Sequence, residues 1–285
     1  MKTFRNKVRE IVNDVIDNRL PLESNTEINF AHPFWTIVMG IEHEKIHLET
    51  TSCLIRQLPL KCLKTTELAA SLFINREYTT SRTLEEALKI TNTWVEVPTT
   101  EVKIGRVHTG FQDRNEHAVP YYGWDNEFGT HTAKLEGFKV SDKLISNAQF
   151  YEFVKENGYE NKELWSEEGW RWSSGTKTLW PKFWVNRSEK QTLEASNFTL
   201  RLTLSETETL PWDFPVEINC FEANAYCRWL SRKLGKAIRL PTEDEFNSTL
   251  THIKYDHKKD SSNVGLVHAS PSPIDKYQVK GIFDP

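Results

Sequence analysis

The spacing of apolar residues changes abruptly near Asn92, and this change constrains the fold more than any other feature of the sequence. Before Asn92, apolar residues recur every three or four positions with charged residues between them, which is typical of amphipathic helices. After it come short apolar runs, scattered Gly and Pro, and many aromatic residues. We therefore expect an α+β protein, with a helical domain over residues 1–91 and a mixed, irregular domain over residues 92–285.

Prolines delimit the helices of the first domain. Apolar spacing predicts a helix over residues 4–16, which ends before Pro21. A second helix is expected from about Pro33, which suits a first helical turn, to residue 57, before Pro59. A shorter helix is expected over residues 84–91.

In the second domain, short strands are expected over residues 94–98 and 102–105, separated by a turn. Only residues 147–156 and 220–234 show good helical spacing there. The chain holds 10 Trp, 8 Tyr and 15 Phe. Aromatic content of this kind favours tightly packed irregular structure over a substrate cleft.

Composition excludes several classes of protein. The net charge of −4 gives no electrostatic reason to expect nucleic-acid binding. No apolar run approaches the roughly 18 residues of a membrane span, and the first residues lack the apolar segment of a signal peptide. Four cysteines form no CxxC pair, and we expect Cys53 and Cys227 to be buried free thiols. We therefore expect a cytoplasmic protein with no nucleic-acid and no membrane partner.

Two histidines on the second helix, His43 and His47, are the strongest candidates for chemistry. Side chains at positions i and i+4 project from one helix face, so both imidazoles can reach one metal ion. The alternative is a pair of histidines satisfied by ordinary hydrogen bonds. Their position within an otherwise apolar helix favours the ligand pair.

The same residues satisfy the zinc-protease pattern His-Glu-x-x-His, with Glu44 as general base and Glu67 as a possible third ligand. This alternative stays open. His32 lies roughly 16 Å from His43 along a helix axis, at about 1.5 Å per residue, so it cannot complete the site from the same helix. We expect His32 to cap the helix or to face solvent.

The residues around the histidine pair resemble the metal-binding helix of 5-histidylcysteine sulfoxide synthases, the first enzymes of ovothiol biosynthesis. This resemblance rests on residues 33–35, 39–50 and 54–59. The later part of the chain resembles the same family's other domain, which is related to formylglycine-generating enzyme, a sulfatase-modifying factor. The matching segments are residues 94–98, 122–129, 164–165, 168–170, 215–216, 222–227 and 239–243.

The resemblance implies a partial DinB-like helical bundle followed by a C-type-lectin-like domain. It also implies a non-haem Fe(II) held by three histidines, two of them His43 and His47. In this family, iron and O₂ join the sulfur of cysteine to the imidazole ring of histidine and give a sulfoxide. Three ligands leave open positions at the metal, which the reactants require.

Further residues are candidates for substrate binding. Arg56 follows the histidine pair on the same helix, and its guanidinium could bind a substrate carboxylate. Asp125, Asn126 and Glu127 could lie at the cleft, but a role in stabilising a turn is at least as well supported.

The family pattern extends beyond this sequence at both ends. It places the first metal histidine on an earlier helix, and a Gly-Asn-Val-Trp-like motif with a tyrosine after residue 285. We therefore expect the middle part of a larger enzyme, in which further segments or a second chain supply the third ligand. Two alternatives remain: a non-catalytic, lectin-like binding module from a degenerate paralogue, and the zinc metalloprotease.

Overall fold

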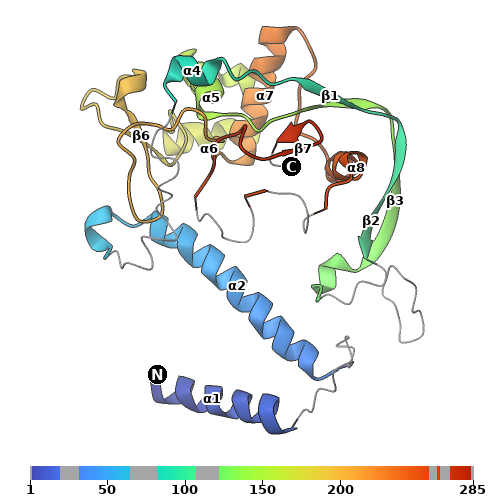
Figure 1. Cartoon of the computed structure of the whole chain (residues 1–285). Helices are drawn as coiled ribbons and strands as arrows, with labels where there is room; N and C mark the ends of the chain where they lie inside the picture. Colours follow the sequence, from blue (N-terminus) through green and yellow to red (C-terminus); the bar gives the residue numbers. More distant parts are fainter. Residues whose placement is uncertain are drawn as a thin grey trace. The chain divides into compact units, whose positions relative to one another are not determined.

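The computed structural model describes residues 2–19, 32–64, 82–106, 122–256, 262–263 and 270–283 (Figure 1). The chain divides into two compact units, one formed by Met1–Ser52 and Gly105–His131, the other by Cys53–Ile104 and Thr132–Pro285. Both units are described separately below. Helices and small two-stranded sheets make up the structure, which confirms the α+β class. The division expected at residues 91 and 92 concerns sequence domains and stays a prediction.

Both long helices of the first unit form where the prolines and the apolar spacing predict them. Helix α1 covers Lys2–Asp14 and continues into a π-helical turn, η1, over Val15–Arg19. Helix α2 covers Phe34–Arg56. The backbone N–H of Phe34 donates to Nδ1 of His32 at 3.1 Å, so His32 caps α2, as expected.

Apolar side chains on these two helices are largely exposed. No residue of α1 is buried, and Phe34 is the single buried residue among those of α2. Phe4, Ile11, Ile41 and Leu48 are each more than half exposed. Within the part of the chain that the structure describes, no helix combines the length and the apolar character needed to cross a bilayer.

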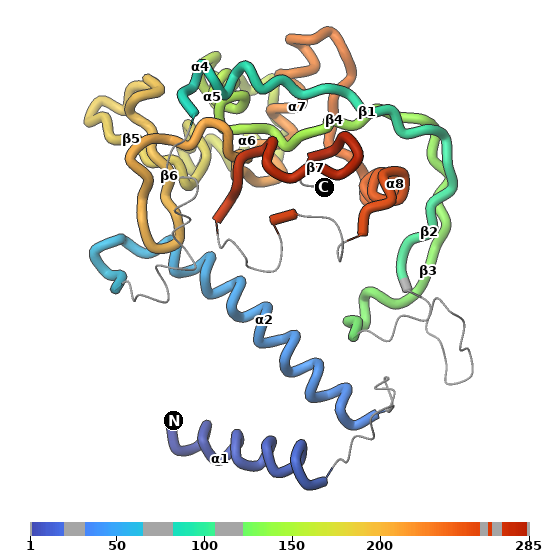
Figure 2. The backbone as a smooth tube through the Cα atoms, in the orientation of Figure 1, coloured from blue at the N-terminus to red at the C-terminus, as the bar shows by residue number. Residues whose placement is uncertain are grey.

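A long two-stranded ribbon follows the short helix α4 (Leu84–Leu88). Strand β1 (Trp94–Val97) pairs antiparallel with β4 (Phe138–Ser141), so that Trp94 lies opposite Ser141. Strand β2 (Thr100–Arg106) pairs with β3 (Gly129–Leu135). Figure 2 shows β2 and β3 running side by side. The strands expected over residues 94–98 and 102–105 are therefore confirmed.

Shorter pairs complete the strands of the second unit. Strand β5 (Trp184–Asn186) pairs antiparallel with β6 (Phe198–Leu200), and β7 (Gln278–Val279) pairs antiparallel with β8 (Ile282–Phe283). Single 3₁₀ turns, η2 (Leu60–Cys62), η5 (Lys162–Leu164) and η6 (Ala195–Asn197), lie between the longer elements.

Four longer helices complete the second unit, two more than the sequence predicts. Helices α5 (Asn147–Lys155) and α7 (Cys220–Leu234) lie where they are expected. Helices α6 (Glu167–Thr176) and α8 (Glu243–Ile253) were not expected, so the prediction of only two helices is wrong. Both have few apolar residues and depend on their N-caps, where the side chains of Ser166 and Thr242 accept backbone N–H groups.

Aromatic rings from α5 and α7 form the centre of the core. Phe150 and Phe153 are fully buried, and the Phe150 ring stacks on Tyr226 at a centroid distance of 5.3 Å. Indole N–H groups in this core find acceptors: Trp184 donates to Asn147 Oδ1 at 3.1 Å and Trp165 to the carbonyl of Gly158 at 3.0 Å. Packing is therefore the role of most of the aromatic residues, as predicted.

All four cysteines are free thiols, but the expected burial of Cys53 is wrong. Cys53 is exposed because the apolar run to which it belongs lies on the largely uncovered surface of α2, where Leu54 is 64% exposed. Cys227, on α7, is half-buried, and this burial raises the pKa of its thiol.

Candidate metal centre

The histidine pair lies in the middle of α2. Because they are four residues apart, His43 and His47 share one helix face, and their ring centroids are 4.5 Å apart with the planes at 82°. Both side chains are exposed within their unit. The two imidazoles are thus close enough to hold a single metal ion between them.

Aromatic residues from a distant segment of the first unit line α2 beside this pair. The ring of Trp124 meets that of His43 edge-on at 6.4 Å, and Tyr122 meets Trp124 edge-on at 5.0 Å. Tyr122 also packs on Trp35, two helical turns before His43, at 5.0 Å. The segment containing Tyr122 and Trp124 therefore follows α2 up to the histidine pair, a contact that no local pattern in the sequence predicts.

A 3₁₀ turn, η4 (Asp125–Glu127), holds Trp124 in this place. The side chain of Glu127 accepts the backbone N–H of Trp124 at 2.9 Å, and the Glu127 N–H donates to the carbonyl of Trp124 at 2.9 Å. A turn-stabilising role is therefore observed for Glu127. Asp125 and Asn126 are exposed on the same turn, and their contacts with a substrate stay predictions.

Negative charge surrounds the aromatic segment. Burial raises the pKa of the Tyr122 hydroxyl, and the carboxylates of Asp125, Glu127 and Glu42 raise it further. Glu42, next to His43 in the sequence, pairs with Lys45 at 2.7 Å. Carboxylates near the histidine pair favour a cation over an anion at this site.

The described residues offer two candidate metal ligands, His43 and His47, and no complete set. Across the described ranges, no group of three His, Cys, Asp or Glu residues is arranged to hold a metal ion. Glu67, the third ligand required by the protease alternative, lies outside the described residues. Two imidazoles on one helix face fit part of a three-histidine iron site, in which the remaining positions stay open for reactants.

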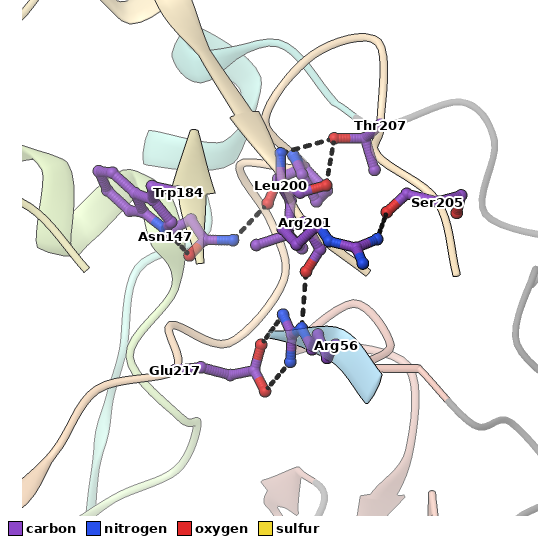
Figure 3. Close-up of polar contacts among 9 residues, drawn as sticks. Arg56, Asn147, Trp184, Leu200, Arg201, Ser205, Thr207 and Glu217 are labelled. Carbon is purple, nitrogen blue, oxygen red and sulfur yellow. Dashed lines mark hydrogen bonds and ion pairs between the residues drawn. The ribbon is translucent and has the colours of Figure 1, made fainter. Parts of the chain in front are cut away.

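Arg56 lies in the second unit, where its guanidinium already binds a carboxylate of the protein (Figure 3). Nη1 and Nη2 donate to the two carboxylate oxygens of Glu217 at 2.6 and 2.5 Å. Nε donates to the carbonyl of Arg201 at 2.6 Å. The expected contact between Arg56 and a substrate carboxylate stays a prediction. In the structure, the carboxylate bound to Arg56 is that of Glu217.

Comparison with known proteins gives a family match over most of the second unit. The model of the Sulfatase-modifying factor enzyme 1-like domain matches residues 81–260. A protein named Hercynine oxygenase from Mycobacterium tuberculosis is 31% identical over 123 residues, which are 43% of this chain and 25% of that protein. Ergothioneine biosynthesis protein 1 from Schizosaccharomyces pombe is 26% identical over 222 residues, which are 72% of this chain and 24% of that protein.

The chain thus spans about a quarter of the length of the curated relatives that it matches. The family model, in contrast, matches well over half of the chain, including α5, α6, α7 and α8. The chain belongs to the Sulfatase-modifying factor enzyme 1-like domain family.

Proposed function

We propose that this chain is part of a non-haem Fe(II)-dependent sulfoxide synthase that couples the sulfur of cysteine to the imidazole ring of histidine with O₂. The observation that carries the proposal is the pair of imidazoles 4.5 Å apart on one face of α2, beside Trp124. Membership in the family described above and relatives named Hercynine oxygenase support an oxygenase. The resemblance of residues 46–50 and 56–59 to the ovothiol branch supports histidine as the imidazole substrate.

The proposed reaction balances without a further reductant. Reducing O₂ to the level of water takes four electrons: two come from forming the carbon–sulfur bond and two from oxidising the sulfur. One oxygen atom remains in the sulfoxide, and the other leaves as water with the protons of the thiol and the imidazole carbon. Cysteine, histidine and O₂ are therefore the only substrates that the proposal requires.

His43 and His47 would hold the iron through ring nitrogens, and the bound iron would supply the activation of O₂. The ring of Trp124 beside His43 would restrict the rotation of this imidazole once the metal is bound. Tyr122 and Trp124 pack edge-on against each other and place aromatic surface on the His43 side of the pair. The third ligand would come from residues outside the described ranges or from a second chain.

Oxygen uptake by the chain, loaded anaerobically with Fe(II), tests this proposal. We expect uptake that requires cysteine and histidine together, with a product whose mass equals both amino acids plus O₂ minus water. Hercynine in place of histidine separates the ovothiol-type reaction from the ergothioneine-type reaction. Uptake that is independent of histidine would contradict the proposal. An intact fold with neither uptake nor metal dependence would favour the lectin-like binding module.

A further inference from the structure

Four residues of the second unit, Arg56, Phe183, Arg201 and Glu217, form a compact cluster around the last turn of α2. Figure 3 shows its three charged members, Arg56, Arg201 and Glu217. We call this group the Arg56 clamp. None of its members belongs to the candidate metal centre, and the sequence separates Arg56 from Glu217 by 161 positions.

Each of the three guanidinium nitrogens of Arg56 donates one hydrogen bond within the clamp. These nitrogens donate to Glu217 and to the Arg201 carbonyl at 2.5–2.6 Å, and the guanidinium carbon lies 3.7 Å from the centroid of the Phe183 ring. The Arg56 side chain is only 10% exposed. A paired, forked and stacked contact of this kind needs a planar guanidinium, and the ammonium group of Lys cannot reproduce it.

Arg201 also binds the segment that contains Arg56. Its Nη2 donates to the carbonyl of Leu58, just beyond the end of α2, at 3.0 Å, while Nη1 donates to the carbonyl of Ser205 at 3.0 Å. Each arginine thus binds the backbone of the other segment. Burial and the nearby charge of Arg56 lower the pKa of Arg201, and the carboxylate of Glu206 opposes this shift. Glu217 forms its ion pair with Arg56.

The two hydrogen-bond partners of Arg56, Arg201 and Glu217, lie on backbone that is hydrogen-bonded to core segments. Arg201 directly follows strand β6, and its backbone N–H donates to the carbonyl of Phe183 at 2.8 Å. Glu217 follows Val216, whose N–H donates to the carbonyl of Ile145, one residue before the N-cap of α5, at 2.9 Å. The clamp therefore ties the end of α2 to backbone that the core already holds.

We infer that Arg56 is a positioning residue, which fixes the end of the helix that carries His43 and His47 to the core of the second unit and does not bind substrate. The part of this inference that concerns the reaction rests on the proposed function. Releasing Arg56 for a substrate carboxylate would leave Glu217 and the Arg201 carbonyl without their donor, which opposes such an exchange.

Two conservative substitutions test the clamp in the full chain: Arg56→Lys, which keeps the charge, and Glu217→Gln, which keeps the size. The matched control is Glu163→Gln, which removes the exposed pair of Glu163 and Arg232 in the same unit. Hydrogen exchange is measured over residues 53–63 and over α5. We expect roughly tenfold faster exchange in residues 53–63 for both clamp variants, with α5 and the control unchanged. Unchanged exchange in residues 53–63 would overturn the inference.

Steady-state kinetics with cysteine and histidine separate positioning from substrate binding. A positioning role predicts a lower kcat in both clamp variants and an unchanged KM for each substrate. A higher KM in Arg56→Lys but not in Glu217→Gln would show that Arg56 touches substrate, and would overturn the inference. If the wild-type chain does not turn over, the proposed function fails, while hydrogen exchange still decides whether the clamp holds α2.

Discussion

Replacing Glu245 with Gln should destabilise the protein at neutral pH, and the loss should vanish in acid. Glu245 lies in the first turn of α8, where its carboxylate accepts both terminal nitrogens of Arg239 at 2.6 Å and the backbone N–H of Thr242 at 2.8 Å. Hydrogen bonds from Arg239 are the largest cause that lowers the pKa of Glu245 from 4.5 to about 2, against an opposing effect of burial.

The size of the effect follows from this shift. A carboxyl group whose pKa falls from 4.5 to about 2 on folding contributes at most about 3 kcal/mol at neutral pH. Arg239 is 63% exposed, so solvent screening reduces the expected contribution to about 1–2 kcal/mol. Because the folded state has the lower pKa, this stability is fully present above about pH 4.5 and is lost as the pH falls through about 2.

Urea unfolding followed by tryptophan fluorescence measures the difference in free energy between the wild type and Glu245→Gln. We expect about 1–2 kcal/mol at neutral pH and a steady decrease below about pH 4.5. Glu243→Gln is the matched control, since Glu243 lies exposed in the same first turn and should contribute only a few tenths of a kcal/mol through the helix dipole. A difference that does not change with pH would refute the electrostatic explanation.

Two further substitutions test the core. Burial raises the pKa of Glu222, which accepts the Tyr159 hydroxyl at 2.5 Å; its charged form therefore costs stability as the pH rises above about 4.5. In urea unfolding, Glu222→Gln should accordingly gain stability relative to the wild type between acid and neutral pH, and a pH-independent difference would contradict this. Gly158→Ala should lower the melting temperature, with a cost of about 2 kcal/mol or more, because the added methyl would overlap the ring of Phe153. Gly175→Ala, where the methyl meets no atom within 4 Å, is the control and should be neutral or stabilising in thermal unfolding.

Local patterns in the sequence were sufficient to predict the elements with strong apolar spacing. Helix α2 begins and ends within a residue or so of the expected limits, because Pro33 and Pro59 mark the two ends and the apolar spacing continues between them. Helices α6 and α8 were missed because their apolar residues are sparse. A signal for α8 was present, however, since Thr242 and Glu245 have the spacing of a capping box.

Contacts between distant segments were beyond the reach of sequence patterns. Spacing along one helix was enough to bring His43 and His47 together. No periodicity connects His43 with Trp124, or Arg56 with Glu217, because these contacts depend on how the chain folds back on itself. The sequence alone suggested a substrate carboxylate as the partner of Arg56, and only the structure shows its ion pair with Glu217.

Binding of Fe(II) to the histidine pair is the central claim, and anaerobic titration of the metal-free chain tests it most directly. The decisive comparison is the wild type against His43→Ala and His47→Ala, with His252→Ala, an exposed histidine on α8, as the control. We predict that each of the first two variants loses affinity for Fe(II) by at least about tenfold, a difference of about 1.4 kcal/mol, and that the control matches the wild type. Equal affinity in all four proteins would contradict the assignment of the metal centre.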